Sequence, residues 1–403
     1  MTASGPVYAP DEMAEALKIK EFDSLMDLLE ELDREGISGD RKQEIYKRYL
    51  NFRARMREQV YSGGFELTPL CNFDCKMCYV HLTKGQMVSE SKLLTTRQWI
   101  DIMEQAVDAG IMHADLTGGE CLSYPGFKDV YLYLLSRGVE VSVLTNGQLI
   151  TEKMADFFAQ YPPSVVQITV YGSNEDSYEA VTGRRAFADV KAAIERLKKR
   201  NIRLFLPITP NRYMQEDTHA LLEFLRSQNV RYGIGTGSLP ARPDTGRDIK
   251  TYAPETELYV RLHLDEQRYL RSQEDSEVLT RTRVDYVPTG FRTESKIPCS
   301  SGLCAFHINW KGEMMPCIPF HSIHRSVLEH GFDECWNWIR NQMIQYEPPA
   351  ECANCANRVI CVSCPAERTS GVLNGPLNKT VCERYEQYVQ AGILQIPQED
   401  TCM

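Results

Sequence analysis

Short apolar runs alternate with longer amphipathic stretches between residues 64 and 235. Strands that alternate with helices pair in parallel, and six such units are fewer than the eight of a closed barrel. The pattern therefore predicts an α/β fold with an open, partial (β/α)6 barrel, whose chemistry lies at the carboxyl ends of the strands. The predicted strands are 65–70, 113–117, 141–145, 165–170, 203–208 and 231–234, and the predicted helices are 96–109, 125–137, 151–160, 175–200 and 217–228.

The sequence on either side of this barrel has a different pattern of apolar and polar residues. Residues 1–60 carry apolar positions at helical spacing and predict an N-terminal helical segment. Residues 255–282 predict a charged helix that bridges from the barrel, bounded at 61–285, to the next unit. From 286 to 403 the periodicity fades and cysteines accumulate. We therefore expect this small C-terminal domain to be held together by metal ligation and not by an apolar core.

The charge and the start of the chain exclude two classes of protein. A net charge of −10 at pH 7 argues against non-specific nucleic-acid binding, which needs a basic surface. No run approaches the ~18 apolar residues of a membrane-spanning helix, and no basic and then apolar signal segment follows Met1. We therefore expect a cytoplasmic protein with no membrane partner, in which metal ligation explains fourteen cysteines better than disulfides do.

Three of these cysteines form a compact motif directly after the first predicted strand. Cys71, Cys75 and Cys78 have the spacing C-x3-C-x2-C. Three thiolates at this spacing bind three irons of a cubane and leave the fourth iron open to another molecule. Zinc is the alternative, because a structural zinc site takes four ligands and His81 supplies a fourth.

The motif resembles that of the radical S-adenosylmethionine (SAM) superfamily, in which three cysteines hold a [4Fe–4S] cluster. The resemblance implies that the open iron chelates SAM and that reductive cleavage of SAM yields a 5′-deoxyadenosyl radical. It also implies that Thr117, Gly118, Gly119 and Glu120, which end the second predicted strand, correspond to the family's GGE motif, with Glu120 on the methionyl ammonium. The other positions that the resemblance assigns to SAM binding are Met77, where the family has an aromatic residue near the adenine, Tyr79, Asn146, Tyr171 and Arg184.

Eight further cysteines near the C-terminus suffice for two four-ligand sites. Their spacing resembles the SPASM domain, which carries two auxiliary [4Fe–4S] clusters in radical SAM enzymes acting on peptides and proteins. Zinc remains the alternative, because C-x2-C pairs also form zinc knuckles. In this family the ligands of the two clusters are interleaved along the chain. The resemblance therefore implies one cluster on Cys299, Cys304, Cys317 and Cys364 and the other on Cys352, Cys355, Cys361 and Cys382. We expect the remaining Cys121 and Cys335 to be buried packing residues and Cys402 to be exposed.

The resemblance implies an enzyme that consumes SAM and abstracts a hydrogen atom. We favour a maturase of the sactipeptide or ranthipeptide type, which forms an oxidative cross-link such as a thioether in a ribosomally made precursor peptide. A peptide epimerase, a small-molecule dehydrogenase and a sulfatase maturase are alternatives. The sulfatase maturase is disfavoured because Ile318 follows Cys317 where those enzymes carry Asp. An iron–sulfur electron carrier or a zinc-bound scaffold is the alternative without radical chemistry.

The cofactors implied are three [4Fe–4S] clusters and SAM. The partners implied are the precursor peptide and an electron donor such as flavodoxin or ferredoxin. We expect the leader of the precursor to be bound by a separate protein, with the N-terminal helical segment at 1–60 as the alternative. No residue in the sequence identifies the catalytic base.

Overall fold

The computed structural model describes residues 30–393, except for gaps. These fall at 31, 35, 37–38, 84, 87–92, 215–217, 236–238, 273–295, 298, 358–360 and 362. Most of the predicted N-terminal helical segment, the end of the predicted bridging helix, and Cys402 therefore lie outside the described residues. No helix in the described part combines the length and the apolar character needed to cross a membrane.

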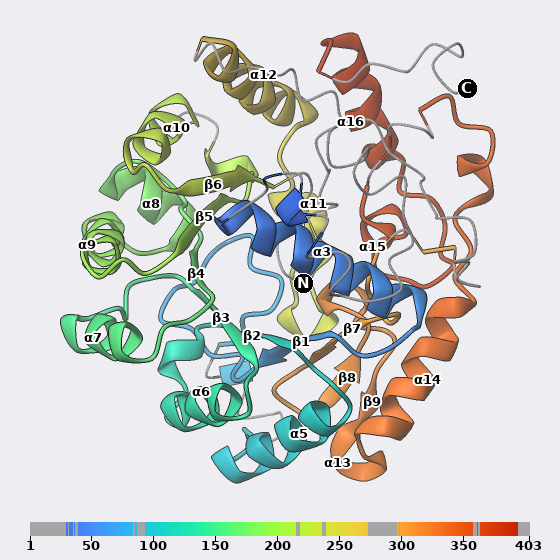
Figure 1. Ribbon diagram of the computed structural model, residues 1–403. Helices are drawn as coiled ribbons and strands as arrows, with labels where there is room; N and C mark the ends of the chain where they lie inside the picture. Colours follow the sequence, from blue (N-terminus) through green and yellow to red (C-terminus); the bar gives the residue numbers. More distant parts are fainter. Residues whose placement is uncertain are drawn as a thin grey trace.

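In the described part of the chain, nine strands form one sheet in the order β6-β5-β4-β3-β2-β1-β7-β8-β9 (Figure 1). The strands β1 to β6 are neighbours in chain order and pair in parallel. Because β6 and β9 are separate edges, the sheet is open, and the predicted α/β fold with a partial barrel is confirmed. The strands are Ser62–Glu66 (β1), His113–Thr117 (β2), Glu140–Thr145 (β3), Val165–Ile168 (β4), Leu204–Ile208 (β5), Arg231–Ile234 (β6), Ala305–Ile308 (β7), Glu313–Met315 (β8) and Arg325–Ser326 (β9).

The first strand begins and ends earlier than predicted, because β1 covers Ser62–Glu66 and the prediction was 65–70. Gly63 and Gly64, which suggest a turn in the sequence, lie inside the strand. A Cβ on Gly63 would stand 2.3 Å from the ring of Phe306, and one on Gly64 would stand 2.4 Å from Nδ1 of His307. These glycines are therefore required by side chains of β7, which the sequence did not predict as a neighbour.

The barrel helices follow their strands and line the outer side of the sheet (Figure 1). The first of them begins with a capping box between Thr95 and Gln98, which satisfies two backbone donors. The predicted single helix over 175–200 is wrong, because Gly183 at φ 69° ends one helix and a second begins four residues later. The helices are Thr96–Asp108 (α5), Phe127–Ser136 (α6), Glu152–Gln160 (α7), Glu175–Thr182 (α8), Phe187–Lys198 (α9) and Thr218–Ser227 (α10).

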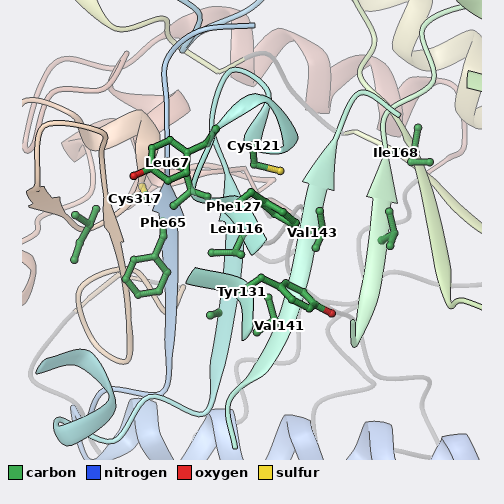
Figure 2. Packing of buried hydrophobic residues seen from close by; sticks show 14 of the residues in the cluster. Phe65, Leu67, Leu116, Cys121, Phe127, Tyr131, Val141, Val143, Ile168 and Cys317 are labelled. Carbon is green, nitrogen blue, oxygen red and sulfur yellow. The ribbon is translucent and has the colours of Figure 1, made fainter. Parts of the chain in front are cut away.

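A continuous apolar core fills the space between the sheet and these helices (Figure 2). Phe65 of β1 is fully buried, and its ring meets Trp99 of α5 edge to face at 6.2 Å between centroids. On its other side Phe65 meets Phe306 of β7 at 5.8 Å. Each such side chain contributes about 1.5–3 kcal/mol on burial, so the core holds the strand ends in fixed positions.

The region after residue 296 contributes more regular structure than its sequence predicts. The strand β7 pairs in parallel with β1, and the β7–β8–β9 meander extends the barrel sheet. These strands have two to four residues, too few for a periodic signal. The helices outside the barrel are Gly39–Met56 (α3), Ile249–Tyr252 (α11), Thr256–Ser272 (α12), Val327–His330 (α13), Phe332–Ile344 (α14), Pro365–Arg368 (α15) and Lys379–Gln390 (α16).

Candidate active site

The loop with Cys71, Cys75 and Cys78 follows β1 at the carboxyl edge of the parallel strands. Cys75 is buried, and Cys71 and Cys78 are half-buried. Burial raises the pKa of the Cys71 thiol to about 12, and the charges of Glu120 and Cys78 contribute. Burial also raises the pKa of Cys75, with contributions from Cys78 and Cys71. The three thiols therefore lie close enough to repel one another as anions, which is the arrangement that a cationic metal cluster relieves.

Backbone amides already point at two of these sulfurs. The N–H of Phe73 donates to Sγ of Cys71 at 3.4 Å, and the N–H of His81 donates to Sγ of Cys78 at 3.2 Å. Such donors stabilise the thiolate form and tune a bound cluster. The donor set therefore fits an iron–sulfur cluster, with the three thiolates as its protein ligands.

The end of α8 holds one side of the cysteine loop. The N–H of Asp74 donates to the carbonyl of Thr182, and the N–H of Lys76 donates to the carbonyl of Val181, both at 3.0 Å. The turn at Gly183 that divides the predicted long helix therefore positions the loop as well.

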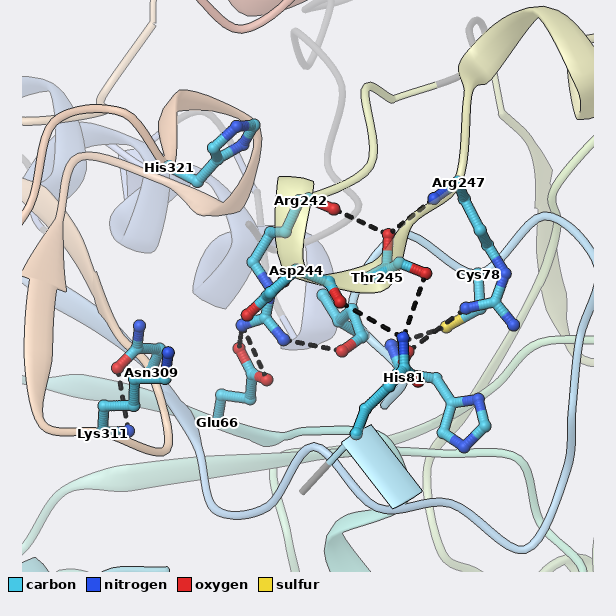
Figure 3. Close-up of polar contacts among 12 residues, drawn as sticks. Glu66, Cys78, His81, Arg242, Asp244, Thr245, Arg247, Asn309, Lys311 and His321 are labelled. Carbon is cyan, nitrogen blue, oxygen red and sulfur yellow. Dashed lines mark hydrogen bonds and ion pairs between the residues drawn. The ribbon is translucent and has the colours of Figure 1, made fainter. Parts of the chain in front are cut away.

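Two arginines hold the other side of the loop (Figure 3). Arg242 donates from its backbone to the carbonyl of Tyr79 and from Nη2 to the carbonyl of Val80, at 3.1 and 2.6 Å. Arg247 donates to the carbonyl of His81 and pairs with Asp74 at 2.9 Å. These contacts tie the segment after β6 to the loop after β1.

Beneath the loop lies a buried ion pair that the sequence did not indicate. Arg242 donates from Nη1 to both carboxylate oxygens of Glu66, at 3.0 and 2.9 Å, and both side chains are at most 5% exposed. Nε2 of His307 lies 3.5 Å from the same carboxylate. Because 176 positions separate Glu66 from Arg242, only the fold reveals this pair.

Gly118 and Gly119 lie directly against the chain that leads into the cysteine loop. A Cβ on Gly118 would stand 2.4 Å from the carbonyl oxygen of Thr68, and one on Gly119 would stand 2.4 Å from that of Leu70. Gly118 also has φ 151°, which favours glycine. The N–H groups of Gly119 and Glu120 donate to these same carbonyls. The glycines therefore bring Glu120 next to the cysteine motif.

The carboxylate of Glu120 is fully buried and held from several directions. It accepts hydrogen bonds from the hydroxyl of Thr145 at 2.8 and 2.9 Å, from the N–H of Asn146 at 2.8 Å and from the N–H of Leu122 at 3.0 Å. Burial raises the pKa of Glu120, and these donors oppose the rise. A carboxylate held beside Cys71 in this way fits the anion that a cationic ammonium requires.

Asn146 connects this carboxylate to the cysteine loop. Its side-chain Nδ2 lies 3.6 Å from Sγ of Cys71 and donates to the side chain of Asn72 at 2.7 Å. Asn72 in turn donates to the side chain of Gln148 at 2.7 Å. The sequence indicated Asn146 through the resemblance, but Asn72 and Gln148 carry no spacing signal and were missed.

The remaining predicted SAM contacts lie around the same loop. Met77 is buried at 6% exposure. Burial raises the pKa of Tyr171, with contributions from the charges of Cys75 and Cys78, and its ring meets that of Tyr178 edge to face at 6.0 Å between centroids. Burial raises the pKa of Tyr79 as well, with Cys78 next. Arg184 follows the α8 turn with its side chain exposed, and its SAM contact stays a prediction.

Four of the C-terminal cysteines, called here the inner group, lie together: Cys299, Cys304, Cys317 and Cys364. Burial raises the pKa of Cys317 to about 11, and the charge of Cys299 contributes next. Burial also raises the pKa of Cys364, with Cys317 and then Cys299 contributing, and the pKa of Cys304 to about 11, with Cys299 among the causes.

The other four, called here the outer group, are Cys352, Cys355, Cys361 and Cys382, and all are half-buried. Burial raises the pKa of Cys382, followed by the charges of Cys361, Cys352 and Cys355. Burial likewise raises the pKa of Cys352, with Cys361 and Cys355 contributing. These charge interactions are compatible with the interleaved assignment that the resemblance implied, and that assignment stays a prediction.

The described cysteines are all free thiols. In the described ranges, no three His, Cys, Asp or Glu side chains converge around a single metal ion. Ligands of a cubane bind separate irons and need no such convergence. Cys121 and Cys335, at 0% exposure, donate instead to the carbonyls of Leu144 and Ser326.

Comparison with known proteins assigns part of this chain to a protein superfamily. Residues 65–225 match the model of the radical SAM superfamily. The chain is 23% identical over 257 residues to the sporulation killing factor maturation protein SkfB of Bacillus subtilis, covering 64% of this chain and 60% of SkfB. Residues 65–225 therefore form a radical SAM domain.

Solved structures show the same fold over most of the chain. Streptococcus suis SuiB bound to its precursor peptide SuiA has a TM-score of 0.64 at 14% identity and covers 94% of both chains. The structure of anSMEcpe with bound AdoMet has a TM-score of 0.61 at 14% identity, over 83% of this chain and 97% of that one. This similarity extends beyond the radical SAM domain into the region of the inner and outer groups.

Proposed function

We propose that this protein is a radical SAM maturase that oxidatively cross-links a ribosomally made precursor peptide. The observation that carries the proposal is the position of Glu120, held beside Cys71 at the carboxyl edge of the sheet. A [4Fe–4S] cluster with SAM supplies the hydrogen-abstracting 5′-deoxyadenosyl radical when both are bound. Relatives named for peptide maturation and a structural neighbour bound to a precursor peptide support the substrate class.

The residues of the barrel have separate tasks in this reaction. Cys71, Cys75 and Cys78 would hold the cluster, and the amides that point at two of the sulfurs would stabilise them as thiolate ligands. Glu120 binds the methionyl ammonium of SAM. Its hydrogen bonds from Thr145 and Asn146 favour the ionised carboxylate and hold it in a fixed position.

The eight C-terminal cysteines serve the oxidative half of the reaction. When a substrate carbon has lost a hydrogen atom, a new bond to that carbon forms with loss of one proton and one electron. Two four-cysteine groups, each with enough ligands to hold a [4Fe–4S] cluster, would supply an acceptor for that electron. We assign the barrel to residues 61–285 and the auxiliary-cluster domain to residues 286–403, after a helical segment at 1–60.

The cross-link is proposed as a thioether. The sulfatase-maturase alternative lacks its base, because Ile318 and Pro319 follow Cys317. We also propose a cytoplasmic location, a flavodoxin or ferredoxin as electron donor, and a separate protein that binds the leader of the precursor peptide.

Iron analysis and product analysis together test the proposal. After anaerobic reconstitution, three cubanes predict about 12 Fe per chain, and the Cys71/Cys75/Cys78→Ala variant predicts about 8. Incubation with SAM, reductant and the precursor peptide is expected to yield 5′-deoxyadenosine and a peptide lighter by two hydrogens. Zinc in place of iron, or no 5′-deoxyadenosine from the reconstituted wild type, would overturn it.

A further inference from the structure

Arg368, next to the outer group, is a buried cation without a carboxylate partner among the residues that the structure describes. Its side chain belongs to α15 and the residue is 7% exposed. The neighbouring Glu367 turns away and forms a two-point ion pair with Arg384, at 2.9 Å for each contact. Within the described ranges, Arg368 forms no ion pair with a carboxylate.

The guanidinium of Arg368 instead points at a sulfur. Nη2 lies 3.7 Å from Sγ of Cys361, and Nε donates to the hydroxyl of Ser363 at 2.6 Å. That hydroxyl lies 3.1 Å from the same sulfur. Because Ser363 accepts from Arg368, its own hydrogen is free to point at Cys361. One sulfur of the outer group therefore faces two donors, one of them charged.

A buried guanidinium is costly unless an anion faces it. Four thiolates around a [4Fe–4S] core carry net negative charge, and a one-electron reduction adds one more. A fixed positive charge therefore stabilises the reduced form more than the oxidised form. Hydrogen bonds to cluster sulfurs act on the potential in addition.

We infer that Arg368 is a positioning residue that raises the reduction potential of an outer-group [4Fe–4S] cluster, with Ser363 as its tether. The inference rests on the proposed function, because it requires iron in the outer group. The inference gives the outer group one role in the reaction, that of electron acceptor. A cluster held there would, with its raised potential, be a better acceptor for the electron released when the substrate bond forms.

A redox titration of the reconstituted full-length protein, followed by electron paramagnetic resonance, tests the inference. In Arg368→Gln, one midpoint is expected to move to a more negative potential by at least a tenfold change in the reduction equilibrium, about 59 mV for one electron. Arg368→Lys keeps the charge and is expected to restore most of the shift. Ser363→Ala is expected to move the same midpoint less. Arg340→Gln, which removes an equal charge from α14 beside Glu58, is the matched control.

The outcomes separate the inference from the proposed function. Wild-type protein without iron, or without 5′-deoxyadenosine formation, overturns the proposed function. Wild-type protein with both, together with an unmoved midpoint in fully loaded Arg368→Gln, overturns only the assignment of Arg368. Loss of four irons in Arg368→Gln and also in Arg368→Lys would overturn it too, because Arg368 would then hold the cluster and not set its potential.

Discussion

The barrel and the region around the outer cysteine group are held together by different means. The barrel has a continuous apolar core that contains Phe65, Trp99 and Phe158. The helix α16, which carries Cys382, packs in a separate small cluster formed by Tyr259, Val381, Tyr385 and Tyr388. A cluster of four buried side chains stabilises little, so we expect the outer region to depend on metal ligation where the barrel does not.

The packing of the inner group is intermediate between that of the barrel and that of the outer region. Cys304 and Cys317 are buried at 0% and 4% exposure, and Cys317 belongs to the barrel core. The strand β7 next to Cys304 is part of the barrel sheet. The comparison shows that cysteines of one sequence region differ in packing, since two inner-group cysteines are buried and all four outer-group cysteines are half-buried.

The largest expected effect is on the chemistry of the barrel. Cys71→Ala removes a cluster ligand and is expected to abolish 5′-deoxyadenosine formation, measured by chromatography after anaerobic incubation with SAM and dithionite. Cys335→Ala is the control, because this buried thiol belongs to neither cysteine group and its loss leaves the formation intact. Substantial 5′-deoxyadenosine from Cys71→Ala would contradict the assignment.

The second effect concerns local folding. The double variant Cys352→Ala/Cys355→Ala is expected to lose hydrogen-exchange protection in α16 while β2, β3 and β4 keep theirs, because only the outer region needs its metal. The matched control, Cys71/Cys75/Cys78→Ala, is expected to keep protection in α16. Equal loss in both regions would show one cooperative unit and remove the distinction between them.

The third effect breaks the buried pair beneath the cysteine loop. Arg242→Met leaves the Glu66 carboxylate buried without its partner and is expected to lower the free energy of unfolding by about 3–5 kcal/mol in urea titrations. Arg247→Met is the control, because its partner Asp74 is exposed, and it is expected to cost at most about 1 kcal/mol. Similar losses in the two variants would contradict the role of burial.

The fourth effect is a pH dependence of the barrel. Burial opposes protonation of His113, yet hydrogen bonds with Asp115 and Glu140 raise its pKa from 6.5 to about 9. Protonated His113 therefore adds roughly 1–3 kcal/mol to the free energy of unfolding. This stabilisation is fully present below pH 6.5 and is lost as the pH rises through 9. Urea unfolding between pH 6 and 9.5 measures it, with His113→Gln as the variant that lacks it. Parallel curves for the two proteins would refute the prediction.

The smallest effect is on the carboxylate that we assign to SAM. Thr145→Val removes the hydroxyl that donates to Glu120 and is expected to weaken SAM binding by roughly fivefold, about 1 kcal/mol. Calorimetry on the reconstituted protein measures the change. Ser142→Ala, on the same strand, is the control and is expected to bind SAM as the wild type does. An unchanged affinity for SAM in Thr145→Val would contradict the assignment of Glu120 to SAM binding.

The sequence by itself determined the parallel strands, the order of the barrel helices and the position of the first cysteine motif. These features are local, because a strand is visible in its own apolar run and Cys71, Cys75 and Cys78 lie within eight residues. The resemblance added Glu120 and Asn146 on the same basis. Local signals failed where a single glycine, Gly183, divided a periodic stretch into two helices.

Only the tertiary structure decided which distant groups meet. It placed β7 beside β1, which explains Gly63 and Gly64, and it paired Arg242 with Glu66. It turned Arg368 toward Cys361 while Glu367 went to Arg384. Such contacts depend on how elements pack over long sequence separations, and the spacing of residues along the chain carries no record of them.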